Sequence, residues 1–372
     1  MNFFSVPYLF ILSIYALVAF IPQKRTQYFL CGLIFILFFG LRGFVGWDWY
    51  SYYAIYNQPI YAIIDKYTAE PIFGFLLVLC KTIGLDYFAF SFVSTSINYI
   101  LLHLIFKEYL NKYAWGYFFF IVFSIEYEID LLRNIKGLLL FVISIKFIQE
   151  RKFFKFLLLN LIGLGFHSSS IVFFFLYFLI NRILIRKIVL ILFIIGCILF
   201  VSQTGIAKII INPLLNYLDG SYALLFTNYL ESDLYSASYG LSLGFLERVI
   251  TFFIIYKNEQ KILSLNKYSH IFINVAYIYM LLMLYFTDFT IFIDRIAAMF
   301  RFFYWILLPY ILFTKGLLPY RKYIIIFYLI FSFARTTAMT NNILYNYDNV
   351  LFGTKTYYER KNIWETFYMN NY

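Results

Sequence analysis

The stretch FFSVPYLFILSIYALVAFI, residues 3–21, decides the fold class, because it contains no charged side chain. A helix of that length covers about 28 Å, close to the roughly 30 Å hydrocarbon core of a bilayer. The stretch lacks a basic leader and a cleavage site of small residues. We therefore expect an uncleaved first membrane span and not a signal peptide.

Similar apolar runs follow along the chain. They lie near residues 28–41, 87–106, 114–126, 134–148, 156–166, 169–180, 188–204, 241–256, 270–286, 296–314 and 323–340. Lys81 and Gly84 interrupt a further piece at 72–85, and the parity of crossings between its flanking loops makes it a re-entrant or interfacial segment. The sequence predicts an all-α, polytopic transmembrane helical bundle of roughly 11–13 spans.

The composition excludes the other broad classes. Of 372 residues, 63% are hydrophobic and 13% are charged, whereas an average soluble domain carries about 25% charge. Soluble enzymes, disordered tails and disulfide scaffolds are ruled out, because too much apolar surface would remain exposed. The predicted organisation is a single transmembrane domain at 1–340 with external loops at 42–71 and 205–240, and an external C-terminal tail at 341–372.

The net charge of +11 follows from membrane topology and gives no support for nucleic-acid binding. The loops at 22–27, 107–113, 149–155, 181–187, 257–267 and 315–322 hold 16 basic and three acidic residues. The other loops and the tail hold 10 basic and 14 acidic residues. Basic loops stay on the cytoplasmic side, so the second set is expected outside.

No cofactor or metal site is predicted. Cys31, Cys80 and Cys197 fall in apolar runs without metal-like spacing, which is typical of buried small side chains. The sequence contains no Walker loop, dinucleotide fingerprint or H-E-x-x-H motif.

The first cluster of candidate residues lies between residues 41 and 53. Arg42 ends an apolar run, and Asp48 lies between Trp47 and Trp49. Aromatic faces beside a carboxylate suit a sugar ring, whose hydroxyls can bond the Asp. The alternative is an aromatic belt at the membrane interface, with Arg42 as a snorkelling anchor.

A second cluster contains Arg133 and Lys136, which lie about one helical turn apart. Such a pair can hold a diphosphate, Arg by its fork and Lys as a point charge. The alternative is that both cations pair with the neighbouring acids Glu126, Glu128 or Asp130.

The third cluster places His167 before Ser168, Ser169 and Ser170 at the external end of an apolar run. His167 is a candidate general base or phosphate donor. Residues adjacent in sequence seldom form a Ser-His triad, so this route to a hydrolase is rejected. Ser168 or Ser169 is alternatively expected to cap the next helix.

A fourth cluster is Asp288, Asp294, Arg295 and Arg301. Arg295 begins an apolar run and points toward the external side, whereas Arg301 lies deeper, with Glu247 as a neutralising partner. Ionisable residues at such positions are functional candidates.

The ordered set resembles the EpsG-like branch of the bacterial Wzy polysaccharide polymerases over about residues 28–315. Asn134, Lys136 and Gly137 depart from the family pattern, as do Trp47 and Trp49. The matching positions are Arg42, Gly46, Asp48, Tyr52, Glu70, Arg133, Phe166, His167, Ser169, Arg295, Ile296, Phe300 and Pro309.

This resemblance implies a metal-independent glycosyltransferase of the bacterial cytoplasmic membrane with its active site facing outward, and a GT-C-like glycosyltransferase architecture is the candidate fold. It would move a growing glycan, such as O-antigen, from undecaprenyl diphosphate onto another lipid-linked repeat unit. Arg133 and Arg295, with Arg42, would hold the diphosphate, and His167 or Asp48 would be the base. The expected substrate-binding set is Arg42, Trp47, Tyr52, Glu70, Lys136 and Ser169.

The expected partners are an undecaprenyl-diphosphate-linked oligosaccharide, the lipid bilayer, a chain-length regulator and a flippase, with no nucleic acid. A lipid-linked oligosaccharide flippase is the main rival, but it predicts charges at the membrane midplane and two related halves. An O-antigen ligase would share the fold and the donor, and is expected to carry a dominant external loop.

Overall fold

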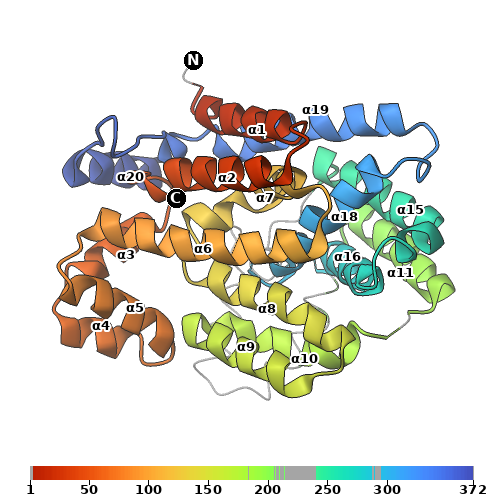
Figure 1. Cartoon of the computed structure of the whole chain (residues 1–372), viewed down its shortest axis with the longest axis horizontal. Helices are drawn as coiled ribbons and strands as arrows, with labels where there is room; N and C mark the ends of the chain where they lie inside the picture. Colours follow the sequence, from red (N-terminus) through yellow and green to blue (C-terminus); the bar gives the residue numbers. More distant parts are fainter. Residues whose placement is uncertain are drawn as a thin grey trace. The chain divides into compact units, whose positions relative to one another are not determined.

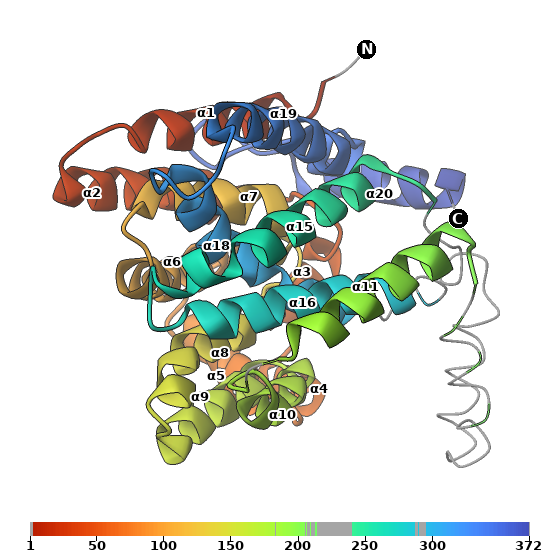
Figure 2. The ribbon, with the colours of Figure 1, turned by 90° about the vertical axis from the view of Figure 1, so that its right-hand side faces the viewer.

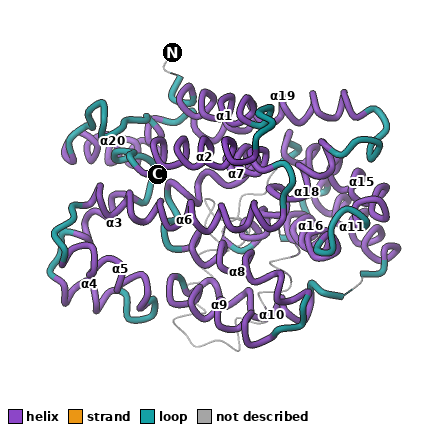
Figure 3. The backbone as a smooth tube through the Cα atoms, in the orientation of Figure 1, coloured by secondary structure: helices purple, strands orange, loops and turns teal. Residues whose placement is uncertain are grey.

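The computed structural model describes residues 3–182, 184–204, 206, 209, 213, 240–286, 289 and 295–371. All regular elements in these residues are helical, which confirms the predicted all-α class (Figure 1, Figure 3). The external loop predicted at 205–240 falls almost entirely outside them, as do Asp288 and Asp294.

The α-helices are α1 (Val6–Val18), α2 (Lys24–Phe35), α3 (Trp49–Tyr56), α4 (Ile60–Lys66), α5 (Pro71–Thr82), α6 (Tyr87–Tyr109), α7 (Tyr113–Ile129), α8 (Asn134–Gln149), α9 (Phe153–Phe166), α10 (Ile171–Leu179), α11 (Arg186–Val201), α15 (Leu243–Leu263), α16 (Ser269–Tyr285), α18 (Phe302–Phe313), α19 (Arg321–Thr340) and α20 (Tyr357–Asn371).

Two compact units make up the chain. The first comprises Met1–Tyr177, Leu308–Thr314 and Tyr320–Tyr372, and the second comprises Phe178–Leu307 and Lys315–Pro319. The tail predicted at 341–372 thus belongs to the first unit, together with the N-terminal helices. The transmembrane extent of the predicted domain at 1–340 stays a prediction.

In the first unit, α8 packs along α9 and α6, and α7 packs against α1, α2 and α19 (Figure 1). Asp86 starts α6 by accepting the backbone N–H of Ala89 at 2.7 Å, which satisfies one of the unpaired donors of the first turn. Two glycines allow the close approach of α8 and α9. A Cβ added to Gly137 would overlap Ser170 Oγ and lie 3.3 Å from the carbonyl oxygen of Gly163, so a side chain there would require these neighbours to shift.

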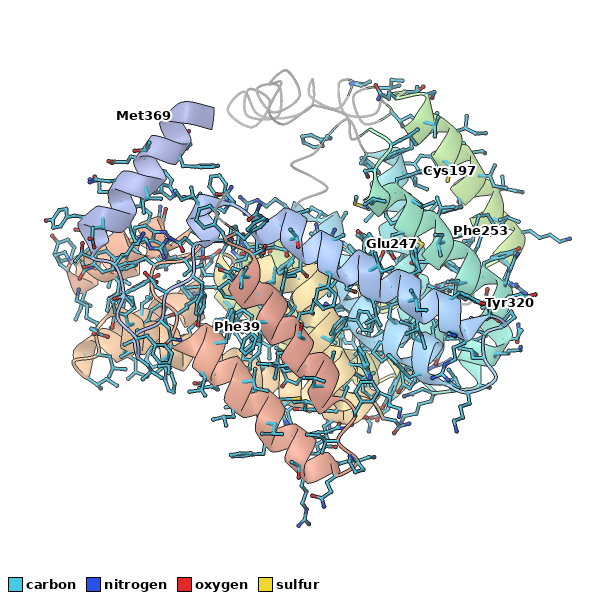
Figure 4. The ribbon with its side chains drawn as sticks, turned by 90° about the horizontal axis from the view of Figure 1, so that it is seen from above. Phe39, Cys197, Glu247, Phe253, Tyr320 and Met369 are labelled. Atoms are coloured by element: carbon cyan, nitrogen blue, oxygen red, sulfur yellow. The ribbon has the colours of Figure 1, made fainter. Side chains whose placement is uncertain are left out.

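A π-helical turn, η1 (Ile36–Gly40), continues α2 and ends just before Arg42. Such turns are often found at functional sites. Phe39, labelled in Figure 4, lies in this turn and is fully buried. The turn places Arg42 in the interior of the first unit, where its side chain is 5% exposed.

In the second unit, α11, α15 and α16 lie side by side (Figure 2). The rings of Phe193 and Phe252 stack face to face with centroids 3.5 Å apart. Glu247 is buried on α15 and accepts hydrogen bonds from Thr251 and from Tyr304 Oη, the latter at 2.9 Å. Glu247 is the residue that the sequence predicted as the neutralising partner of Arg301, and that pairing stays a prediction.

Two helices in the described part of the chain, α6 and α19, are long and apolar enough to cross a membrane. Six shorter apolar segments of 10–17 residues accompany them. One is α5, whose 12 residues cover about 18 Å, less than the roughly 30 Å of a hydrocarbon core. The total of roughly 11–13 spans expected from the sequence stays a prediction.

Candidate functional site

Glu70 is the centre of the candidate site. It lies in the N-cap position of α5, immediately before Pro71, and its side chain is 7% exposed. One carboxylate oxygen, Oε1, accepts hydrogen bonds from His167 Nδ1 and from the backbone N–H of Ser168, the latter at 3.2 Å. The other oxygen, Oε2, pairs with Nη1 of Arg133. Glu70 therefore joins two predicted catalytic residues that come from separate helix ends.

Arg133 occupies the N-cap position of α8 and is partly exposed, at 29%. Its Nε donates to the hydroxyl of Tyr52 at 3.3 Å, and its guanidinium carbon lies 5.5 Å from the ring centroid of Tyr67. The alternative that Arg133 pairs with the acids just before it is wrong, because its ion pair is with Glu70. Nη2 makes none of these contacts, so the fork retains donors for a ligand.

The electrostatics keep Glu70 ionised. Burial alone raises the pKa of its carboxyl group, but the hydrogen bond and charge of His167, the charge of Arg133 and the Ser168 N–H outweigh burial and lower it to about 2. In the neutral form of His167 that a base requires, the ionised Glu70 accepts the Nδ1–H, and Nε2 is the nitrogen that carries the lone pair. The His167 side chain is 16% exposed, and Nε2, which does not take part in the Glu70 contact, is the candidate atom for proton transfer.

Ser168 lies beside His167 and also contacts the Glu70 carboxylate. The three serines form the 3-10 turn η2 (Ser168–Ser170), whose N-cap is His167 without a side-chain cap. The hydroxyl of Ser168 lies 3.4 Å from Glu70 Oε1. The serine cap expected for the helix that follows stays a prediction. Asn134 Nδ2 donates to Ser169 Oγ at 3.5 Å. Asn134, which differs from the family pattern, therefore contacts a serine two residues after His167.

Arg42 is not near the Glu70 carboxylate but in a buried cluster of its own. It donates to the carbonyl of Phe39, to Thr95 Oγ1 at 3.2 Å and to the carbonyl of Glu128 at 3.0 Å. Its guanidinium also lies 3.9 Å from the Glu128 carboxylate. These contacts join the π-turn to the end of α7, so Arg42 acts on the fold of this region.

Lys136 belongs to the same buried region. Its Nζ donates to Ser94 Oγ at 2.7 Å and to the carbonyl of Leu132 at 2.9 Å, and its side chain is fully buried. The structure thus separates the partners of Lys136 from those of Arg133. The prediction that the pair jointly faces a diphosphate does not agree with this arrangement.

Asp130 organises the loop that carries Trp47 and Asp48. Its carboxylate accepts the backbone N–H groups of both residues and the hydroxyl of Tyr345, the last at 2.7 Å. Burial and the nearby charge of Asp48 raise its pKa to about 7, although these three hydrogen bonds act in the opposite direction. Sequence reasoning considered Asp130 only as a partner for Arg133. The one sequence feature that could have indicated a role for Asp130 is an acidic residue close after an aromatic-rich run.

The C-terminal helix α20 covers this loop. Trp364 Nε1 donates to the carbonyl of Trp47 at 3.2 Å, and the Trp364 ring stacks on Tyr50 with centroids 4.9 Å apart. A buried ion pair of 3.1 Å between Arg360 and Asp348 anchors the helix. Met369, near its end, is 80% exposed (Figure 4).

Arg295 is exposed and belongs to the second unit. Tyr52, Glu70, Arg133 and His167, by contrast, all lie in the first unit and contact one another. Apart from Arg295 and Ser169, the predicted residues therefore form a converging group of four, a loop that holds Trp47 and Asp48, and a buried pair, Arg42 and Lys136.

The fold and the site define an all-helical protein with an ionised carboxylate held between a histidine and a partly exposed arginine. The chain belongs to the EpsG family, whose model matches residues 25–349. This match confirms the resemblance that the ordered motifs indicated. No curated protein and no solved structure matches the chain.

Proposed function

We propose that this protein is a polysaccharide polymerase of the bacterial cytoplasmic membrane. It would transfer a growing glycan from undecaprenyl diphosphate onto a second lipid-linked repeat unit at the outer face. Membership of the EpsG family supports a polymerase-like activity in polysaccharide biosynthesis. The convergence of Glu70, Arg133 and His167 is the single observation that carries the proposed chemistry.

A membrane environment is supported by the surface of the helices. On α11, Ile188, Ile191, Ile195 and Ile198 are each at least 43% exposed and recur at helical spacing. Such a stripe is unfavourable in water and favourable against lipid hydrocarbon. Inner-membrane location, multiple spans and the outward orientation form part of the proposal.

In the proposed reaction His167 is the general base. Nε2 takes the proton of the acceptor hydroxyl while that oxygen attacks the anomeric carbon of the donor sugar. The bond from that carbon to the diphosphate oxygen breaks, and the diphosphate leaves with the electron pair. General-base assistance of this kind contributes about 10²–10⁴-fold to a rate.

The charge of the site changes in the direction that the reaction needs. Before transfer, the charges of Glu70 and Arg133 cancel, and the proposed base is the neutral form of His167. Once His167 holds the proton, the group carries about one net positive charge, while the leaving diphosphate gains negative charge. Stabilisation that grows toward the transition state accelerates the chemical step, whereas uniform binding does not.

The remaining predicted residues have supporting roles in the proposal. Arg133 binds the diphosphate, and Trp47 and Tyr52 contribute aromatic surfaces for the sugars. The role expected for Arg295 stays a prediction. Arg42 positions the loop between α2 and α3 by its buried hydrogen bonds. Asp48 is the alternative base, and substitution of each residue separately distinguishes the two.

Deletion of the gene followed by electrophoresis of the cell's polysaccharide tests this function. A polymerase defect removes the ladder of chain lengths and retains a single repeat unit on its final carrier. Loss of every unit would instead indicate a flippase or a ligase. A His103→Ala variant is a suitable complementation control, because His103 bonds Tyr113 away from the Glu70 cluster.

A further inference from the structure

A cavity of about 230 Å³ lies between α4 and α5 in the first unit. Its lining is mostly apolar and consists of Ile64, Tyr67, Thr68, Pro71, Gly74, Phe75 and Val78. Sites that enclose a whole small ligand usually measure about 300–1,000 Å³. This groove therefore has room for only part of a larger molecule.

One end of the groove meets the candidate site. The Tyr67 ring lines the groove, and the guanidinium carbon of Arg133 lies 5.5 Å from its centroid. Glu70 lies between the lining residues Thr68 and Pro71 in sequence. The same turn of chain thus supplies both the apolar wall and the carboxylate that holds Arg133.

The sides of the groove are open. Ile64 and Phe75 line it but are 56% and 65% exposed, whereas Tyr67 is 6% exposed and forms its inner wall. Gly74 keeps the two helices close, because an added Cβ would lie 3.0 Å from Cβ of Tyr67. An apolar channel with one charged end and open sides suits a chain that enters from surrounding hydrocarbon.

We propose that this groove holds the first isoprenoid units of a polyprenyl diphosphate. The inference rests on the proposed function, since it places the lipid of the donor whose diphosphate binds Arg133. In a prenyl diphosphate the hydrocarbon is joined directly to the phosphate oxygen. In a phospholipid, glycerol and two polar esters separate phosphate from hydrocarbon. An apolar wall that begins at the cation itself fits the first arrangement.

Short prenyl diphosphates test the groove with the purified full-length chain in detergent. Calorimetry would compare farnesyl diphosphate with inorganic diphosphate for the wild-type protein and for Val78→Phe, which fills the groove. Leu79→Phe is the matched control, because Leu79 follows on the same helix, is 44% exposed and does not line the groove. Ile64→Ala is a second variant that removes a wall from an exposed position.

The wild type and Leu79→Phe are expected to prefer farnesyl diphosphate by about tenfold or more, since burying hydrocarbon increases affinity. Val78→Phe and Ile64→Ala should lose most of this preference and retain their affinity for inorganic diphosphate. A Val78→Phe protein with the full preference would overturn the proposal. Equal competition by phosphatidylglycerol would overturn it as well, because the groove would then accept any anionic lipid.

Failure of the groove and failure of the polymerase function are distinguishable. If the deletion strain keeps its glycan ladder while the purified protein shows the farnesyl preference, the polymerase proposal fails and the lipid diphosphate site stands. If the ladder is lost and the wild-type protein shows no preference, the groove proposal fails and the polymerase function stands.

Discussion

Glu70 and His167 are 97 residues apart in the sequence, yet Glu70 Oε1 accepts a hydrogen bond from His167 Nδ1. Glu70 precedes α5 and His167 follows α9, and these two helices pack against each other. The contact orients the imidazole ring and fixes which nitrogen carries the proton. The proposed base therefore depends on a carboxylate from a distant part of the chain.

Glu70→Gln is expected to reduce the rate of glycan transfer by roughly 10²-fold or more, because a neutral amide does not stabilise the protonated imidazole. Glu70→Asp, which keeps the charge on a shorter side chain, should retain more activity. The measurement is the transfer rate with a lipid-linked repeat unit. Equal rates for the wild type and Glu70→Gln would show that the carboxylate charge has no catalytic role.

The same carboxylate predicts an acid sensitivity of the fold. The pKa of Glu70 is lowered from its ordinary 4.5 to about 2, so its ionised form stabilises the folded state. That stabilisation is complete above pH 4.5 and is lost as the pH falls through about 2. Melting temperatures between pH 6 and 3 should therefore fall more for the wild type than for Glu70→Gln. Parallel curves would contradict the shift.

Asp130 predicts the opposite dependence. Burial and the charge of Asp48 raise its pKa from 3.8 to about 7, so the folded state holds a proton that the unfolded chain releases. Its contribution to stability thus decreases as the pH rises from about 3.8 to about 7. Between pH 5 and 8 the wild type should lose melting temperature relative to Asp130→Asn, which does not titrate. A constant difference between the two proteins would be the contrary result.

Gly46 and Gly84 form a matched pair for testing the loop that Asp130 organises. Both have positive φ angles, 92° and 81°. A Cβ at Gly46 would overlap the Asp130 carboxylate, whereas a Cβ at Gly84 would meet no atom within 4 Å. Gly84→Ala should cost only the backbone strain of roughly 1–2 kcal/mol. Gly46→Ala should cost more and reduce transfer activity, as measured by denaturant unfolding and by the transfer rate.

The sequence predicted the helical class and named Tyr52, Glu70, Arg133 and His167 as site residues. Hydrophobic runs and the order of the motifs can be recognised in the sequence alone. Which candidates meet was not readable, because the contacts of Glu70 span 63 residues to Arg133 and 97 to His167. The acids close to Arg133 in the sequence were the expected ion-pair partners. The packing of the helices places Glu70 beside Arg133 instead.

Arg42 and Lys136 show a second limit of the sequence. A cation near a span end has the same pattern whether it faces a ligand or bonds within the protein. The π-turn before Arg42 and the full burial of Lys136 decide between these roles, and both depend on tertiary packing. The groove beside Tyr67 could not be predicted from the sequence either, because it is formed by the spacing of two helices.

The most direct measurement is elongation of a synthetic lipid-linked repeat unit by the purified protein, with release of the lipid diphosphate followed in parallel. The proposed mechanism predicts that the wild type builds a ladder of chain lengths, that His167→Ala slows it by about 10²–10⁴-fold, and that Asp48→Asn retains most of the rate. A His167→Ala protein that elongates at the wild-type rate would contradict the assignment of the base. A well-folded wild-type protein that releases no lipid diphosphate would contradict the polymerase function itself.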